Sequence, residues 1–396
     1  MWLYLIIFFV PVLLYLYRQY LSKDVHFLAM MLGFLALFVG MGDMLGGYDR
    51  YIYGEIFDAI ADTTTLGHSY LLDGSFSYFP KESGFIRINI IISWFTENRY
   101  IFILLLTFII YSLLFVSLKR YAVNYPFAVI VFLGLWFFFT FTYLRQVLGA
   151  TVAWLSIPYI IKRKPIKFFI VVLIAMSIHK SAILFMPVYF IAHISWSQKT
   201  VKWTMIAALL LGLSSIPNSL FSAYGDMSQV EMQADYSAAG GFRIAYFLEA
   251  AFFLWIIWKN YEDFENCDIQ TRVLLNMALI FCALLLFFIR SENGGRLSWY
   301  YIIGIICTLT TIAMRNKNIH SLAPLLIVVM LFLYIRIFDA WQGNNNYLLN
   351  LYPYKTFLSP GYRAGDYSYE NYEYDHGYDY NKFYRRAFRL KINIKR

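Results

Sequence analysis

Long apolar runs recur along almost the whole chain and limit most strongly what it can fold into. A helix needs about 20 apolar residues to cross a bilayer. The sequence offers about twelve candidate spans, several of them short: 1–17, 25–42, 100–118, 125–143, 144–161, 166–179, 181–194, 203–217, 243–258, 272–290, 297–314 and 319–338. We therefore predict an all-α, polytopic integral membrane protein of about twelve transmembrane helices.

The composition excludes most other classes. Of the 396 residues, 60% are hydrophobic and 14% charged, whereas an average soluble protein is about 45–50% apolar and about 25% charged. A soluble enzyme, a nucleic-acid-binding protein and a disulfide scaffold are all disfavoured. The three cysteines, Cys267, Cys282 and Cys307, have no histidine at metal-ligand spacing, so we predict neither a zinc site nor a disulfide framework.

Loop charges predict the orientation, because cytoplasmic loops of membrane proteins are enriched in lysine and arginine. One set of alternate short loops holds fourteen basic residues: Arg18, Lys23, Lys119, Arg120, Lys162, Arg163, Lys164, Lys167, Lys199, Lys202, Lys259, Arg272, Arg315 and Lys317. We assign these loops to the cytoplasm. The longer loops 43–99 and 218–242 then face outward, as do both termini.

Two segments depart from this pattern of spans. Residues 85–97 are apolar but interrupted by polar groups, which favours an interfacial or re-entrant helix within the long outward loop that follows the second span. The tail from 362 to 384 has eight tyrosines among polar residues and few aliphatic ones. We therefore divide the chain into a membrane domain, 1–358, and a Tyr-rich basic tail, 359–396. We predict that this tail is disordered or lies on the surface; the alternative is an aromatic surface that stacks on sugars or sits at the lipid headgroups. Truncation after Leu358 should leave an inserted, folded protein.

Charged residues beside spans are the candidate functional groups, because a charge in the membrane is costly. Four arginines lie on the outward side, against the charge bias. The full set of candidates there is Arg145, Gln146, His179, Arg243, Arg290, Arg296 and Tyr300, with Asp49 and Glu82 in the long outward loop. A single arginine at a helix end is usually an anchor to headgroups, and a lone histidine is more often packed than catalytic. Several guanidinium groups together favour a phosphate or pyrophosphate ligand.

Three stretches of the sequence are similar to a known family. The first is GGYDRYIYGEIFD (46–58), with ESGF (82–85); the second is YLRQVLGATVAWLSIPYIIKRK (143–164), followed by IAMSIHKSAILFMPVYF (174–190); the third is RLSWY (296–300), with YPYKTFL (352–358). They resemble the EpsG-type polysaccharide polymerases, relatives of the Wzy O-antigen polymerases. The RQ pair followed by the mid-membrane histidine is the most specific part.

The resemblance implies a bacterial plasma-membrane enzyme that joins undecaprenyl-pyrophosphate-linked oligosaccharide repeats on the outer face of the membrane. It implies motif residues at Asp49, Arg145, Gln146, His179 and Arg296. It also implies that neither nucleotide sugar nor ATP is used. We expect no cofactor, and our mechanistic hypothesis is that Arg145, Arg290 and Arg296 bind the pyrophosphate without a metal. Membrane lipid, a chain-length regulator and a flippase are the implied partners, and nucleic acid is not one.

The chemistry of such a transfer suggests a role for each residue. Arginines would stabilise the departing pyrophosphate, and His179 or Asp49 would accept the proton of the acceptor hydroxyl. Arg296 and Tyr300, four residues apart, are expected to share a helix face. Tyr300 could then contact phosphate or sugar, and Glu82 could orient sugar hydroxyls.

Three alternatives remain open. One is a GT-C type glycosyltransferase with a polyprenyl-phosphate sugar donor, often metal-dependent. The second is a flippase or transporter of lipid-linked oligosaccharide, and the third is an O-antigen-type ligase.

Overall fold

The computed structural model describes residues 2–44, 47–214, 216–217, 242–291, 294–315, 319–342, 351, 354–358 and 385–389. Almost all of the second outward loop and the Tyr-rich stretch 362–384 lie outside these residues. The described part is helical, and an isolated β-bridge joins Gly42 to Thr356. This agrees with the all-α prediction.

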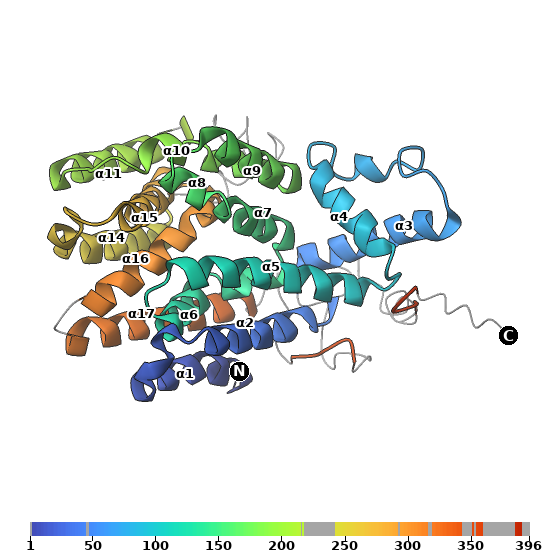
Figure 1. Ribbon diagram of the computed structural model, residues 1–396, viewed down its shortest axis with the longest axis horizontal. Helices are drawn as coiled ribbons and strands as arrows, with labels where there is room; N and C mark the ends of the chain where they lie inside the picture. The colour runs from blue at the N-terminus through green and yellow to red at the C-terminus, as the bar shows by residue number, and fades with distance from the viewer. Residues whose placement is uncertain are drawn as a thin grey trace. The chain divides into compact units, whose positions relative to one another are not determined.

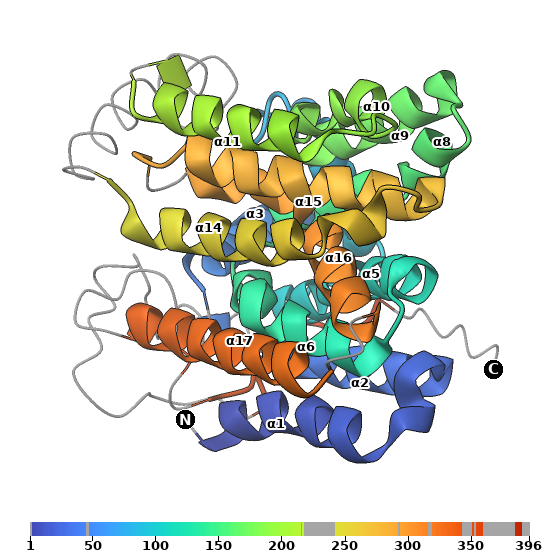
Figure 2. The same ribbon diagram turned by 90° about the vertical axis from the view of Figure 1, so that its left-hand side faces the viewer.

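Figures 1 and 2 show the helices of the described residues, labelled in chain order. The first half contains α1 (Trp2–Tyr17), η1 (Gln19–Lys23), α2 (Val25–Gly40), α3 (Tyr48–Leu66), η3 (Ser75–Ser77), α4 (Ser83–Ser93), α5 (Arg99–Tyr121), α6 (Tyr125–Leu135), η4 (Phe137–Phe141), α7 (Leu144–Trp154), α8 (Ile157–Ile161), α9 (Pro165–Ile178) and η5 (Lys180–Phe185). The second half contains α10 (Val188–Ile191), α11 (Gln198–Gly212), α14 (Ile244–Lys259), η6 (Tyr261–Phe264), α15 (Ile269–Phe287), η7 (Gly294–Tyr301), α16 (Ile302–Arg315) and α17 (Ile319–Gln342).

Several helices are suited to a membrane. Among the described residues, five helical stretches are long and apolar enough to cross one: Arg99–Tyr121, Leu144–Ile161, Ile269–Phe287, Gly294–Arg315 and Leu322–Ala340. The other predicted spans coincide with shorter apolar helices such as α1, α2 and α9. The chain is therefore a helical membrane protein.

Two backbone hydrogen bonds join segments that are distant in the chain. The backbone amide of Asp43 donates to the Lys355 carbonyl, and that of Phe357 donates to the Met41 carbonyl, each at 3.1 Å. The segment after α2 is therefore paired with residues 355–357, which follow α17 in the chain. The number of twelve spans stays a prediction.

The chain divides into two compact units. The first comprises Met1–Phe115, Phe132–Leu148 and Leu326–Arg396; the second comprises Val116–Val131 and Gly149–Leu325. In the second unit, α15 packs against α11, α14 and α16 (Figure 2). Gly304 of α16 permits this close approach, because a Cβ there would lie 2.6 Å from the backbone nitrogen of Ala278. Small residues commonly allow such contacts between membrane helices.

In the first unit, the segment expected as a long loop proves to be largely helical. α3 and α4 pack against each other through Ile56, Ile60, Ile86 and Ile90. The sequence did not predict α3 as a helix, because its acids masked an amphipathic pattern. The assignment of 43–99 to the outward side of the membrane stays a prediction. α4 has 11 residues, which suits the interfacial or re-entrant helix predicted at 85–97.

Buried Arg50 anchors the start of this segment to the end of α2. Its guanidinium donates to the carbonyls of Val39, Gly40 and Gly42 at 2.6–3.0 Å. These carbonyls end α2, where a positive charge is favoured. Burial lowers the pKa of Arg50 to about 10, although the negative charge of Asp43 acts to raise it. The side chain therefore stays cationic at neutral pH.

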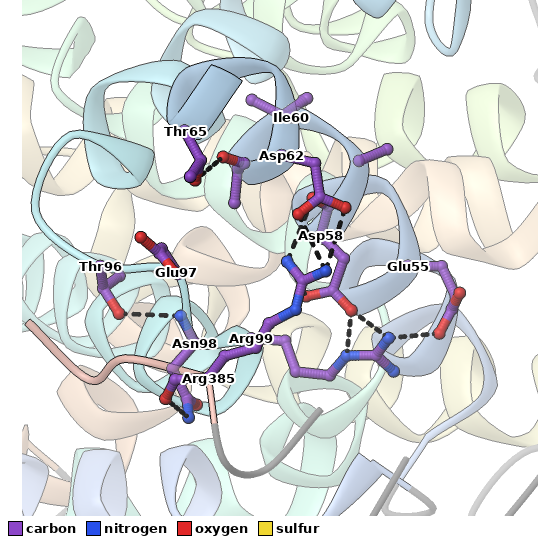
Figure 3. A network of polar contacts seen from close by, with 12 residues as sticks. Glu55, Asp58, Ile60, Asp62, Thr65, Thr96, Glu97, Asn98, Arg99 and Arg385 are labelled. Carbon is purple, nitrogen blue, oxygen red and sulfur yellow. Dashed lines mark hydrogen bonds and ion pairs between the residues drawn. The ribbon is translucent and has the colours of Figure 1, made fainter. Parts of the chain in front are cut away.

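A second network ties the C-terminal residues 385–389 to α3 (Figure 3). Arg99, which begins α5 and is fully buried, pairs with Asp58 and Glu55. Arg385 lies 3.7 Å from Asp58 and 2.9 Å from Asp62. Burial alone would lower the pKa of Arg385, but its hydrogen bond to Asp62 and the nearby Asp58 charge raise it.

Backbone contacts complete this attachment. The carbonyl of Arg386 accepts from the Glu97 amide, and the amide of Arg389 donates to the Phe95 carbonyl at 2.8 Å. The Arg389 side chain donates to Ala61 and Thr65 of α3. Five residues of the predicted tail thus belong with the first unit, and truncation after Leu358 would remove contacts that α3 has in the full chain.

We expect the double change Arg385→Ala and Arg389→Ala to loosen α3. Loss of a charge-assisted hydrogen bond typically costs about 1.5–3 kcal/mol. Asp58 keeps its ion pair with Arg99 in this double variant, so its buried charge stays neutralised. The measurement is the rate of limited proteolysis within α3 in the purified protein. Arg386→Ala is the matched control, because that side chain is exposed. Equal rates for the two variants would contradict the attachment.

Candidate functional site

In the first unit, Arg145 and Glu82 form an ion pair between the starts of two helices. Glu82 is the N-cap residue of α4, and Arg145 lies in the first turn of α7. The arginine lies over the ring of Phe79, 3.8 Å from its centroid. The positive end of a helix dipole lies at its N-terminus and disfavours a cation there. The negative charge of Glu82 offsets this unfavourable interaction for Arg145.

Asp49 and Gln146 lie in the same unit. The amide of Asp49, in the first turn of α3, donates to Thr142 Oγ1 at 3.2 Å. Gln146 follows Arg145 and is buried. The starts of α3, α4 and α7 are therefore bound to one another through Thr142 and Arg145, and four of the predicted site residues belong to these three helices.

The same arrangement occurs at α5. Arg99 and Arg145 each begin a candidate membrane span, and each is neutralised by carboxylates from α3 or the start of α4. Sequence reasoning missed Arg99. The available signal was the one already used for Arg145, an arginine at the start of a long apolar run.

We expect Arg145 and Glu82 to be energetically coupled. Arg145→Met or Glu82→Gln alone leaves one buried ionised partner, which is strongly destabilising, whereas removing both avoids that cost. Contacting residues typically show coupling of about 0.5–3 kcal/mol. Thermal unfolding of the single and double variants measures it. Additive losses would mean that the pair contributes no interaction energy.

In the second unit, His179, Ser181 and Tyr300 form a buried hydrogen-bonded group, here termed the histidine cluster. His179 ends α9, Ser181 lies in η5 and Tyr300 in η7. Ser181 Oγ lies 2.6 Å from His179 Nδ1 and 2.9 Å from the Tyr300 hydroxyl, which is 3.2 Å from the same nitrogen. Ser181 was not foreseen, because the sequence gives no sign that residues 181 and 300 meet.

Arg243, Arg290 and Arg296 lie at helix ends of the same unit and are termed the basic cluster. The amide of Arg243, before α14, donates to the Ile289 carbonyl at 2.8 Å, which places residues 243 and 290 on adjoining backbone. A Cβ at Gly295 would lie 2.4 Å from the Tyr246 ring, so the start of η7 also packs against α14. Arg290 Nη1 donates to the Leu213 carbonyl at 3.3 Å.

The short helix η7 carries a member of each cluster, Arg296 and Tyr300. It is a 3₁₀-helix, with three residues per turn, so residues four apart do not share a face. The expectation that Arg296 and Tyr300 do so is therefore wrong. Tyr300 is fully buried towards His179, whereas Arg296 is partly exposed.

The described residues contain no group of three or more His, Cys, Asp or Glu side chains that could hold a metal ion. What the second unit offers is a buried imidazole with hydroxyl partners, and guanidinium groups at neighbouring helix ends. Such groups can accept a proton and bind an anion.

The sequence was compared with models of known protein families. The model of the EpsG family matches residues 26–356. The chain belongs to the EpsG family. The match spans every candidate site residue from Asp49 to Tyr300 and stops before the C-terminal segment 385–389. No curated protein and no solved structure matches the chain. The EpsG family is associated with polysaccharide biosynthesis at membranes, so the chain is a membrane protein of that kind.

Proposed function

We propose that this protein polymerises undecaprenyl-pyrophosphate-linked oligosaccharide repeats on the outer face of the bacterial plasma membrane. The observation that carries the proposal is the placement of the basic cluster and the histidine cluster at the two ends of η7. The EpsG family and the membrane-type helices support the substrate class. The proposal includes the twelve-span topology and the outward orientation predicted from the loop charges.

The reaction has two electrostatic demands. The acceptor hydroxyl oxygen forms a bond to the anomeric carbon of the donor chain, and the bond from that carbon to pyrophosphate breaks. Negative charge develops on the departing undecaprenyl pyrophosphate, and preorganised cations stabilise such charge. In the proposal, Arg290 and Arg296 bind this group, with Arg243 beside them, because guanidinium makes paired hydrogen bonds to phosphate.

The acceptor hydroxyl must lose its proton, and His179 is the proposed base. Histidine exchanges a proton near neutral pH, and Nδ1 of His179 lies within hydrogen-bond distance of the hydroxyl groups of Ser181 and Tyr300. Asp49 is the alternative base. Arg145 with Glu82, and Gln146, are proposed from their motif positions to bind part of the lipid-linked substrate.

A test in cells separates a polymerase from a flippase. In cells lacking this protein, a polymerase leaves single lipid-linked repeats at the outer surface, accessible to an impermeant lectin or glycosidase. Loss of a flippase would instead retain the repeat on the cytoplasmic side, protected from the same reagent. The second outcome would overturn the proposal.

A further inference from the structure

An exposed apolar surface, here termed the interfacial patch, lies where α3 and α4 end. Trp94 Nε1 donates to the Tyr70 hydroxyl at 3.2 Å, and the amide of Arg389 donates to the Phe95 carbonyl at 2.8 Å. These bonds hold together the end of α3, the end of α4 and the C-terminal residues. The side chains of the patch are between 56% and 89% exposed: Leu66, Leu71, Leu72, Trp94, Phe95 and Phe388.

The patch lies beside the start of a candidate membrane span. α5 begins at Arg99, four residues after Phe95. Four residues extend over at most about 14 Å, so Trp94 and Phe95 stay near the depth at which α5 enters the membrane. Tryptophan is enriched at that depth, between the hydrocarbon and the headgroups. The apolar surface is therefore continuous with a surface that lipid covers.

Acidic side chains at this edge would repel anionic headgroups. Asp62 lies one helical turn before Leu66 on α3, and Glu97 follows Phe95 by two residues. The C-terminal segment supplies a cation to each acid. Arg385 lies 2.9 Å from Asp62, as Figure 3 shows, and Arg389 lies 3.6 Å from Glu97. Residues 385–389 thus offset the negative charge beside the patch and add the exposed ring of Phe388.

We propose that residues 385–389 are a membrane-interface anchor. They complete the interfacial patch with Phe388 and neutralise Asp62 and Glu97, so that the patch enters the headgroup region of the leaflet at which α5 begins. Anionic phospholipid covers the patch. Amphipathic surfaces bind such a leaflet through buried apolar area and electrostatic attraction. This anchor is separate from polymerisation and requires only that α5 crosses the membrane.

Spin labelling of the full-length protein measures the lipid contact directly. The protein carries Cys267→Ser, since the other two cysteines are buried, and is placed in vesicles of phosphatidylethanolamine and anionic phosphatidylglycerol. A nitroxide attached through Phe388→Cys is exposed to oxygen, which concentrates in lipid, and to a water-soluble nickel complex. The nickel collision rate at 388 should be low, while that of oxygen should be high.

Two exposed positions calibrate the measurement. Phe332→Cys, on the candidate span Leu322–Ala340, gives the lipid value, and Glu265→Cys, between η6 and α15, gives the aqueous value. A label at 388 that is as accessible to nickel as the label at 265 would overturn the anchor. A label at 388 shielded from both reagents would also overturn it, because a protein contact would then cover the patch.

The neutralising role has its own test, read from a label attached through Phe95→Cys. Loss of both cations in Arg385→Ala with Arg389→Ala should raise the nickel collision rate at 95 towards the aqueous value. Adding Asp62→Asn and Glu97→Gln to that protein should return the rate to the starting value, because the repelling charges are then gone.

Arg386→Ala is the matched control, because this exposed arginine lies between the other two and its loss leaves both ion pairs in place. It should leave the rate at 95 unchanged. An unchanged rate after loss of Arg385 and Arg389, or no recovery when the acids are neutralised, would contradict the neutralising role. The measurement at 388 uses neither change, so it decides the lipid contact even if these variants do not fold.

Discussion

Replacement of His179 by glutamine is expected to reduce chain transfer by about 10²–10⁴-fold, the usual contribution of a general base. Binding of the lipid-linked repeat should persist, because the base acts on the acceptor hydroxyl and not on the pyrophosphate. Glutamine keeps a polar side chain in the buried space next to Ser181 and Tyr300. Polymer length and yield on a gel, with repeat binding measured separately, test this expectation.

His193→Gln is the matched control for this substitution. His193 lies in the same unit, and its Nε2 bonds to the Ile160 carbonyl at 2.7 Å. We place it in a structural role, so its replacement should leave polymer synthesis close to normal. Full activity of the His179→Gln protein would contradict His179 as the base and favour Asp49 instead. Equal losses of activity in the His179→Gln and His193→Gln proteins would indicate a structural effect.

Arg296→Ala is expected to cost about 10²–10³-fold in rate, as loss of one preorganised stabiliser of a developing anion typically does. Arg296→Lys should recover only part of it, because lysine keeps the charge but lacks the planar, paired donors of guanidinium. Arg290→Ala should have a smaller effect, since its guanidinium already donates to the Leu213 carbonyl.

Lys180→Ala provides the comparison for the arginine. Lys180 is partly exposed and adjoins His179 in the chain, yet we assign it only an anchoring role. Its loss should change the rate little. If Arg296→Ala protein is present at normal levels and makes full ladders, the anion-binding role fails and the flippase alternative gains support.

The membrane class and most helix positions could be predicted from the sequence. Apolar runs such as 272–290 and 319–338 coincide with α15 and α17, because hydropathy over a long window reports directly on burial in lipid. α3 was missed for the opposite reason. It carries Asp49, Glu55, Asp58 and Asp62, and these charges resemble those of a loop.

The site could be predicted only as a set of residue types. The positions of Arg145, His179 and Arg296 were chosen on charge and motif, but their partners depend on contacts over long separations. Glu82 is 63 residues from Arg145, and Tyr300 is 121 from His179. No periodicity in one sequence encodes such pairs, and the 3₁₀ geometry of η7 likewise reflects tertiary packing.

The central claim is that this protein alone joins lipid-linked repeats without a metal. The direct measurement incubates the purified full-length protein in lipid with undecaprenyl-pyrophosphate-linked repeat, with and without a chelator, and resolves the products by length. We predict a ladder of polymers that is the same in both samples and absent with the His179→Gln protein. A ladder abolished by chelator and restored by a divalent cation would contradict the proposed chemistry in favour of a metal-dependent glycosyltransferase. Absence of any ladder from intact protein would contradict the claim itself.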